Sequence, residues 1–461
     1  MKIIGYNELK KYAEIAMNRI MSKNVTHAEI YISHQVDVTI RYSNDRCIST
    51  FSDECGMACR VLNSSGGYGF SCGTVDCEMD VINVSKEALM MCSKCESKGQ
   101  LILPDVLDKK IKRVDNLFDR TLVNYLSNFK NYSELLRDIM EDIIFAYNRH
   151  KHSISSLKYD IFINFELKSY LIENSLGVEA YEKLSKIYVY IDITLRNAYG
   201  SIGFYYDFDV GRYLADININ SDDNIARIVA KALEFSYARK MKNTFKGELI
   251  SGYVPSYELC FSIVEHANAL DVLSGITYMT NMRNRKISTD KLTIIDDGTI
   301  PRGVNSSTFD DEGVPKQRIT VVDRGILKNY LHNSYTAFIM HEKNNACAYR
   351  LNYQSNVLIM PSNVIIVPGA QKTSEMIEDT KKGIFIDIGG LDIDITTGRM
   401  NSPILYGYLI EKGEVTSVIK SIFITNSVME LLKNISAVSK DYRQEPGLIM
   451  PSIKISNVTF M

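Results

Sequence analysis

The sequence predicts an α+β protein, with a mixed α/β N-terminal half built from β-meander units and a β-rich C-terminal domain. Apolar residues recur at helical spacing in several segments before residue 245, and alternating, strand-like segments lie between them. Beyond Gly247, short strand-like segments are separated by Gly and Asp turns. A chain of 461 residues can bury two or three cores. We expect units at residues 1–110 and 111–244 and a C-terminal domain at residues 245–461.

The first unit is predicted to combine an opening helix with strands over residues 28–72. The helix is indicated by apolar residues on one face, namely Leu9, Tyr12, Ala13, Ala16 and Ile20. Residues 63–67 read NSSGG between two strand-like segments, which predicts a hairpin because glycine accepts the positive φ of tight turns. A phosphate-binding loop is the rival interpretation. It fails because no helix begins directly after these glycines.

The second unit repeats this order, with a helix at residues 133–147 followed by strand-like segments. Residues 200–204, GSIGF, are similar to GGYGF at residues 66–70, which suggests a diverged duplication. A helix that begins after Ser221 closes the unit. In the C-terminal domain we expect a hairpin at residues 406–415 and few helices, at about 256–273, 374–382 and 427–435.

Charge and hydropathy exclude several classes of function. The 53 Lys and Arg residues nearly balance the 55 Asp and Glu residues, so no overall field favours nucleic acid or an anionic membrane. The N-terminus lacks the pattern of a secretory signal, and no apolar stretch reaches the roughly 18 residues of a membrane span. We expect a soluble cytoplasmic protein that binds neither nucleic acid nor membrane.

The nine cysteines are expected to be reduced, because the number is odd and no feature indicates secretion. Cys92 and Cys95 form the one CxxC. They lie at helical spacing with an apolar stripe, which favours packed thiols over a redox or metal pair. Zinc would need two further ligands at comparable spacing, and the sequence offers no second pair.

Residues 309–315, FDDEGVP, are the most distinctive text in the chain. Together with GMACRV at 56–61, GYLIEKG at 407–413 and GLIMPSIKI at 447–455, this segment resembles the TldD/PmbA family of intracellular metalloprotease subunits. The ending is similar to that of PmbA-type (TldE-type) chains. Protease subunits of the family carry a zinc-ligating cysteine near this end, and no cysteine follows Cys347 here.

The resemblance also implies where a zinc helix would lie. Protease subunits of the family carry HExxxH, in which two histidines hold zinc and the glutamate activates the bound water. The matching positions here are His266, Ala267 and Asp271, so the glutamate and the second histidine are missing. The resemblance therefore implies no catalytic, cofactor or metal residue in this chain.

His266 and Asp271 leave a metal site open as an alternative. Residues five apart on a regular helix point about 140° apart, so the pair would need a distorted helix to share an ion. We instead expect a packed histidine, on an apolar seam with Leu259, Ile263, Leu270 and Leu273. Even with a metal bound, Ala267 could not accept a proton.

Other candidates have simpler structural interpretations. His341-Glu342 completes no zincin spacing and is expected in a loop or at a helix end. Cys347 lies near this histidine, but a packed thiol is favoured over a nucleophile. Asp310, Asp311 and Glu312 precede Gly313, which favours a turn over a cation or peptide site. Asp392 and Asp394 share a strand face and suit either paired carboxylates or solvent-facing acids.

The resemblance implies a non-catalytic subunit that shapes a cavity for extended or precursor peptides, while a TldD-type HExxxH partner supplies zinc. Two other hypotheses stay open. One is a peptide-binding or carrier protein that needs no partner and can form a homodimer. The other is an active hydrolase with a metal site rebuilt around His266, Asp271 or His341.

Overall fold

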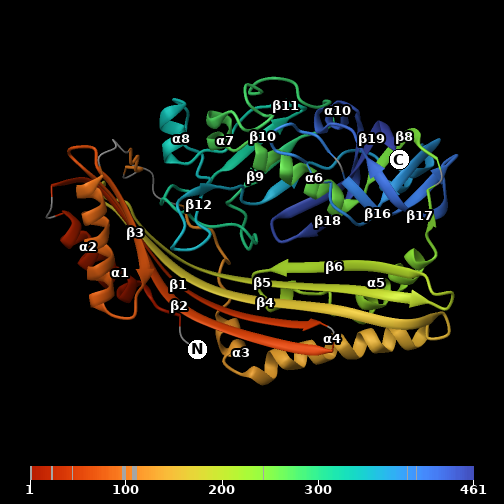
Figure 1. The fold of residues 1–461 in the computed structure, drawn as a ribbon, viewed down its shortest axis with the longest axis horizontal. Coiled ribbons are helices and arrows are strands. Elements are labelled where there is room, and N and C mark those ends of the chain that lie inside the picture. The colour runs from red at the N-terminus through yellow and green to blue at the C-terminus, as the bar shows by residue number, and fades with distance from the viewer. Residues whose placement is uncertain are drawn as a thin grey trace.

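In the computed structural model, a curved sheet carries the N-terminal half of the chain and a second, larger sheet carries the C-terminal half (Figure 1). The structure describes residues 3–21, 24–43, 45–95, 100–105, 112–241, 243–391, 393–400 and 402–461. No helix within these ranges is long and apolar enough to cross a membrane. The α+β class is confirmed.

The N-terminal sheet is antiparallel, with the order β3-β2-β1-β4-β5-β6. Its strands are β1 (Val25–Ser43), β2 (Arg46–Asn63), β3 (Tyr68–Thr74), β4 (Ile154–Asn174), β5 (Glu179–Asn197) and β6 (Ile202–Gly211). Because β1 pairs with β4, the two predicted N-terminal units share this one sheet. The predicted boundary between them, at residues 110 and 111, lies outside the described residues.

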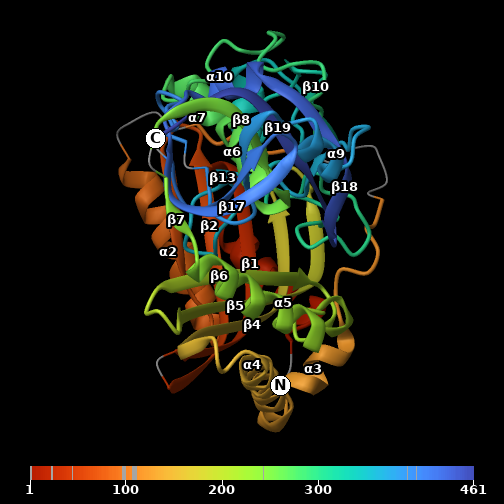
Figure 2. The same cartoon turned by 90° about the vertical axis from the view of Figure 1, so that its right-hand side faces the viewer.

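Helices cover the face of this sheet that points away from the C-terminal domain (Figures 1 and 2). They are α1 (Tyr6–Met21), α2 (Glu78–Lys94), α3 (Arg120–Leu126), α4 (Phe129–Arg149) and α5 (Asp222–Ser236), with a 3₁₀ turn at Leu214–Asp216. Strand β4 shows the period of two: Ile161, Ile163 and Phe165 are buried beneath helices, whereas Phe162 and Glu166 are half-buried on the other face. The second face is therefore polar and aromatic, and it points toward the C-terminal domain.

The duplication suggested by the sequence is visible in two matching turns. Asn63 and Asn197 each end a strand, and each side chain accepts hydrogen bonds from two backbone amides of its turn. Each also donates to a carbonyl near the end of a helix, at Cys92 (3.1 Å) and Ser236 (3.2 Å). Gly66 and Gly200 have φ of 86° and 85°, the left-handed conformation that glycine permits. The order helix, three strands, helix thus occurs twice.

The C-terminal domain is built on a sheet with the order β11-β10-β9-β14-β19-β8-β15-β16-β17-β7, in which β18 also pairs with β19. Its strands are β7 (Arg239–Lys240), β8 (Phe245–Ser251), β9 (Ile294–Asp297), β10 (Arg318–Asp323), β11 (Ile326–Leu327), β14 (Val364–Ile366), β15 (Lys382–Ile386), β16 (Ser402–Glu411), β17 (Glu414–Ile424), β18 (Ile435–Glu445) and β19 (Leu448–Phe460). A separate pair joins β12 (Ala348–Tyr349) to β13 (Leu358–Ile359). The predicted hairpin is confirmed as β16 and β17, which turn at Lys412-Gly413.

Helices in this domain are short: α6 (Tyr253–His266), α7 (Ala269–Ser274), α8 (Ser334–Ile339), α9 (Thr373–Glu378) and α10 (Val428–Lys433). The single helix predicted at residues 256–273 is wrong, because α6 ends at His266 and α7 begins at Ala269. Leu331 causes the break: its backbone N–H donates to Ala267 O (2.9 Å) and its carbonyl accepts from Ala269 N–H (3.0 Å). The carbonyl of Ala267 and the N–H of Ala269 therefore form hydrogen bonds with Leu331 instead of with helical partners.

Candidate functional site beside helix α6

His266 is the last residue of α6 and is held as a packed side chain. Its ring lies edge-on to Tyr278, with 5.3 Å between centroids, and its Nδ1 is 3.2 Å from the Tyr278 hydroxyl. Its Nε2 is 3.5 Å from Ser262 Oγ. Burial lowers the pKa of His266, although Asp394 opposes this. Both ring nitrogens thus have uncharged neighbours, and the neutral imidazole is favoured.

The residues around His266 do not fit a zinc site. Ala267 is buried and carries only a methyl group, and Asp271 lies on α7 beyond the break. Among the residues that the structure describes, no group of three or more His, Cys, Asp or Glu side chains could hold a metal ion. A six-residue HExxxH segment confined to α6 would have to end at His266, and its first two positions would then be Phe261 and Ser262. Neither of these is a usual zinc ligand or a proton acceptor of suitable pKa.

The apolar seam predicted through His266 is only half present. Leu259 and Ile263 are fully buried, but Leu270 and Leu273 are 37% and 39% exposed, because the chain changes direction at Asn268. The side chain of Asn268 starts the new helix by accepting the N–H of Leu270 at 2.9 Å. Sequence periodicity missed this helix boundary, although an asparagine N-cap was available as its signal.

A groove of about 410 Å³ runs along the exposed side of α6. It is lined by Tyr257, Glu258, Phe261, Glu265, His266 and Leu391. Burial and the neighbouring Asp271 raise the pKa of Glu265. Asp394 instead accepts hydrogen bonds from the backbone and hydroxyl of Thr397, which lower its pKa. Asp392, its predicted companion, lies outside the described residues.

A second cleft, of about 440 Å³, adjoins this groove, because Phe261 lines both. Its walls come from β4 and β5 of the N-terminal sheet and from the loops around Ser306 and Arg350 of the C-terminal domain. The two halves of the chain therefore enclose it together. We call it the interdomain cleft.

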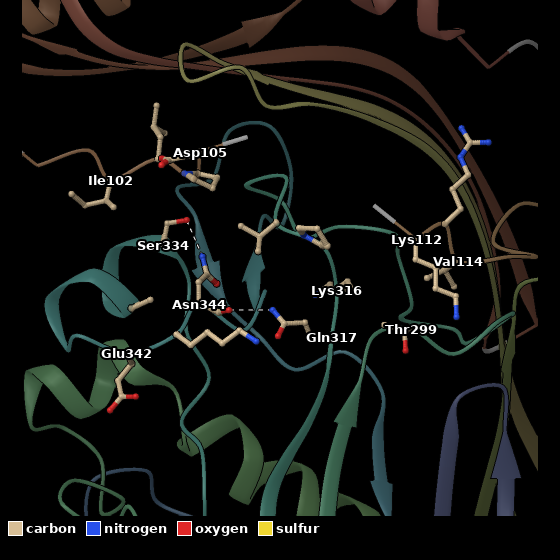
Figure 3. Close-up of a pocket in the computed structure, with 17 residues that line it drawn as sticks. Ile102, Asp105, Lys112, Val114, Thr299, Lys316, Gln317, Ser334, Glu342 and Asn344 are labelled. Carbon is tan, nitrogen blue, oxygen red and sulfur yellow. Dashed lines mark hydrogen bonds between the residues drawn. The ribbon is translucent and has the colours of Figure 1, made fainter. Parts of the chain in front are cut away.

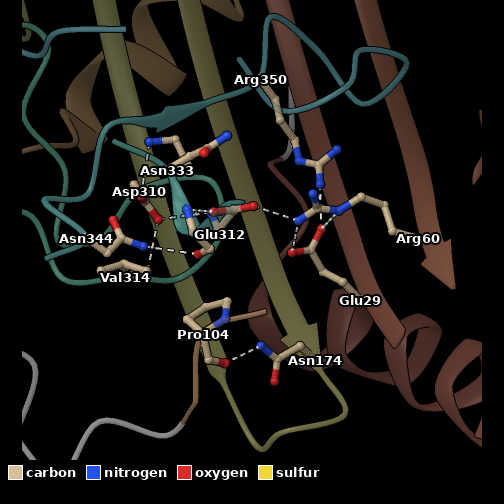
Figure 4. Close-up of polar contacts among 12 residues, drawn as sticks. Glu29, Arg60, Pro104, Asn174, Asp310, Glu312, Val314, Asn333, Asn344 and Arg350 are labelled. Carbon is tan, nitrogen blue, oxygen red and sulfur yellow. Dashed lines mark hydrogen bonds and ion pairs between the residues drawn. The ribbon is translucent and has the colours of Figure 1, made fainter. Parts of the chain in front are cut away.

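The acidic residues 310–312 form a buried turn beside the interdomain cleft (Figure 4). Asp310 accepts backbone N–H groups of Glu312 (3.0 Å), Val314 (2.9 Å) and Ala348 (3.1 Å). Asp311 accepts the N–H of Arg350 at 2.6 Å. These contacts confirm the predicted turn, in which aspartate bonds local amides and Gly313 takes a φ of 84°.

Glu312 connects this turn to a buried ion cluster made of Glu29, Arg60, Glu312 and Arg350 (Figure 4). Arg60 Nη2 lies 3.0 Å from Glu312 and 2.5 Å from Glu29, and Glu29 also accepts Arg350 Nη2 at 2.5 Å. Burial opposes ionisation of Glu29, but the two arginine charges lower its pKa overall. Sequence reasoning missed this cluster, since its members are up to 321 residues apart.

A cavity of about 790 Å³ is lined by Val314, Pro315 and Lys316, the residues that follow the turn (Figure 3). Glu342 lines it and pairs with Arg283. His341 and Glu342 follow the end of α8, as predicted for a helix end.

Cys347 is fully buried, and burial raises the pKa of its thiol, so the thiolate that a nucleophile requires is disfavoured. Cys92 is likewise buried and donates to Gly67 O at 2.9 Å.

His332 gives this region a predicted pH dependence. Burial and the Arg283 charge lower its pKa from 6.5 to about 4. The unfolded chain therefore binds a proton at a higher pH than the folded chain does, so stability is complete above about pH 6.5 and falls toward pH 4. Between about pH 6.5 and pH 4, the free energy of unfolding of His332→Gln should fall by up to about 3 kcal/mol less than that of the unchanged protein. Urea unfolding of both proteins at several pH values checks this, and parallel pH profiles would contradict it.

Comparison with known proteins shows which proteins the C-terminal domain is similar to. Residues 255–461 match the PmbA/TldA metallopeptidase C-terminal domain. The C-terminal domain of this chain is therefore similar to that of the TldD/PmbA family. Its relatives include a TldD homologue described as a metalloprotease from Buchnera aphidicola, which is 31% identical over 200 residues. A metalloprotease of Methanocaldococcus jannaschii is 34% identical over 188 residues. Each match covers 40% of this chain and 41% of the relative.

Two solved structures share the fold over nearly the whole chain. TldE from Thermococcus kodakarensis superposes with a TM-score of 0.80 at 19% identity and covers 98% of this chain and 99% of its own. A putative modulator of DNA gyrase from Bacteroides thetaiotaomicron gives 0.83 at 18% identity and covers 99% of both chains. At these identities the likeness establishes the fold alone.

Proposed function

We propose that this chain is a non-catalytic subunit of a TldD/TldE-like metalloprotease complex that cleaves unfolded or precursor peptides. A TldD-type partner with HExxxH would supply the zinc, and this chain would shape the peptide-binding cavity. The end of α6 carries the proposal: it presents one packed histidine, followed by the methyl group of Ala267 where the HExxxH motif has its glutamate. Metal-assisted hydrolysis needs an open metal position and a nearby proton acceptor.

The free edge of β2 supports an assembly role. Strand β3 pairs only with residues 56–62 of β2, whereas residues 46–54 are exposed, including Ile48 at 59% and Phe51 at 60%. An edge strand with unpaired backbone groups is where another chain or an extended peptide can add by strand pairing. This edge therefore offers a site for a partner subunit or for substrate.

The same edge favours a second candidate, a self-associating peptide-binding or carrier protein. In an antiparallel pair of two β2 edges centred on Thr50, Arg46 of one copy would face Glu54 of the other. Such opposite charges across strands stabilise pairing. The symmetric contact would close a dimer.

Reconstitution separates the two candidates. The chain is mixed with a TldD-type HExxxH subunit from the same cell, and complex formation and hydrolysis of an unstructured peptide are measured. The subunit hypothesis expects a mixed complex and turnover that depends on both chains. A chain that forms only homodimers, and that leaves the partner's turnover unchanged, would support the carrier hypothesis.

A hydrolase rebuilt around His266 makes a different prediction. For the packed histidine that we describe, His266→Ala should lower the unfolding free energy by about 1 to 3 kcal/mol through lost contacts with Tyr278. Turnover by the reconstituted complex, scaled to folded protein, should be unchanged. Loss of all turnover at unchanged stability would instead identify His266 as part of an active site.

A further inference from the structure

The interdomain cleft contains an excess of positive side chains. Five cationic residues line it, Lys168, Lys186, Arg212, Lys316 and Arg350, against three carboxylates, Glu166, Asp310 and Asp311. Arg350 belongs to the ion cluster with Glu29. The other four line the cleft from both halves of the chain. Lys168 lies on β4, Lys186 lies on β5 and Arg212 directly follows β6, whereas Lys316 follows the acidic turn of the C-terminal domain.

None of these four cations forms an ion pair with a residue that the structure describes. Arg212, which is 3% exposed, donates only to the backbone carbonyls of Gly303, Ser185 and Ser306, at 3.1, 2.8 and 2.6 Å. Lys316 donates to Ala346 O at 2.9 Å. Lys186 donates to Asn305 Oδ1 at 3.2 Å. Arg212 is buried and the three lysines are half-buried, and a buried cation such as Arg212 is normally paired with an acid.

Lys168 is the fourth, and it is held by aromatic rings. Its Nζ lies 5.2 Å from the Tyr170 ring centroid and 5.9 Å from that of Tyr31. This contact places the ammonium group without neutralising its charge.

Two of the three carboxylates of the cleft are engaged by backbone amides. Asp310 and Asp311 accept the backbone amides described above, and burial raises the pKa of Asp310 to about 7, which reduces its charge at neutral pH. Glu166 lies across from Lys186 on β5, but it also lies across from Asp37 on β1, a like charge. Burial lowers the pKa of Lys186 and that of Arg212, the latter to about 10, although the Glu166 charge opposes both shifts. Burial also opposes the charge of Lys168, but nearby Tyr31, Asp311 and Glu166 raise its pKa overall.

We propose that the interdomain cleft binds the C-terminal carboxylate of an extended peptide through Lys186, Lys168 and Lys316. The inference rests on the proposed peptide-binding function and adds which end of the peptide is held. Apolar side chains beside these lysines, Phe261, Leu351 and Met360, fit a carboxylate that carries a hydrocarbon neighbour. Charge-assisted contacts of this kind are the stronger class of hydrogen bond.

The test compares two fluorescent, unstructured peptides that differ only at the C-terminus, one a free acid and one an amide, by anisotropy with the full chain at low salt. We expect the free acid to bind about tenfold more tightly, and we expect Lys186→Met to abolish that preference. Lys168→Met is a second variant in case the first unfolds, and thermal melts report folding of each.

Lys158→Met is the matched control. Lys158 is exposed on β4 and its side chain points to the same face as that of Lys168. Ten residues of strand place it about 33 Å away, beyond the roughly 10 Å screening length at 0.1 M salt. The control should keep the preference for the free acid.

Each outcome of this test supports or overturns the carboxylate site. Preference for the acid that is lost in Lys186→Met and kept in Lys158→Met supports the site. Equal binding of acid and amide overturns the carboxylate site and leaves peptide binding intact. Binding of neither peptide overturns both. If inorganic phosphate displaces the free-acid peptide at a concentration equal to that of the peptide, the cleft is a phosphate site, and the assignment to a peptide is overturned.

Discussion

Glu29→Gln is expected to lower the free energy of unfolding by about 3 to 5 kcal/mol, because it leaves buried arginines with too little negative charge. Glu29 is 1% exposed and accepts hydrogen bonds from both Arg60 and Arg350. Arg350 has no exposed surface, so its charge cannot turn to water. Glu312 alone would then have to balance two guanidinium groups. Urea unfolding followed by circular dichroism measures the loss.

The control for this prediction is Glu134→Gln. Glu134 forms an exposed pair with Lys130 on α4, with 3.6 Å between the charged atoms. Its loss should change stability by less than about 1 kcal/mol. Adding Arg350→Met to Glu29→Gln should make the double variant less destabilised than the sum of the single variants, because the two groups compensate each other. A Glu29→Gln protein as stable as the control would contradict the role of the cluster.

Gly203→Ala is expected to lower the unfolding free energy by about 3 kcal/mol, the upper end of the range for an overpacked core. A Cβ at Gly203 would lie 2.0 Å from Ala232 O and 2.5 Å from Ser236 N, both in the backbone of α5. Backbone of a packed helix cannot move aside as a flexible side chain can, so α5 must shift from the sheet. Thermal and urea unfolding check the size of the effect.

Because the helix–strand unit is duplicated, the same effect is expected in the first repeat. Gly69 occupies the matching place in the first repeat, and a Cβ there would lie 2.1 Å from Ala88 O in α2. Gly69→Ala should therefore cost about as much as Gly203→Ala. Gly5→Ala is the control, because nothing lies within 4 Å of a Cβ at that position. Either variant behaving like Gly5→Ala would refute the close helix–strand contact in that repeat.

Local patterns predicted much of the fold. The apolar face of α1, the start of α5 after Ser221, the turn at residues 63–67 and the β16–β17 hairpin each follow from spacing or from turn residues that lie close together in the chain. The join of the two N-terminal units through β1 and β4 could not be seen, because strand pairing between distant segments leaves no local signal. The register of Glu29 opposite Arg60 was hidden for the same reason.

The site was predictable only in part. Residues 310–312 were expected to make a turn, and their short-range contacts with Val314 confirm it. The break after His266 depends on Leu331, which is 65 residues away, and helical spacing alone continued the helix through Asp271. The interdomain cleft has walls from both halves of the chain, so its charge excess is a property of the tertiary structure.

The most direct test of the central claim is elemental analysis and peptide hydrolysis by the isolated chain. After purification without chelators and dialysis against zinc, we predict far less than one zinc ion per chain and no turnover of an unstructured peptide. Turnover should appear only when a TldD-type subunit is added. One tightly bound zinc ion per chain, together with turnover in the absence of any partner, would contradict the assignment of this chain as a non-catalytic subunit.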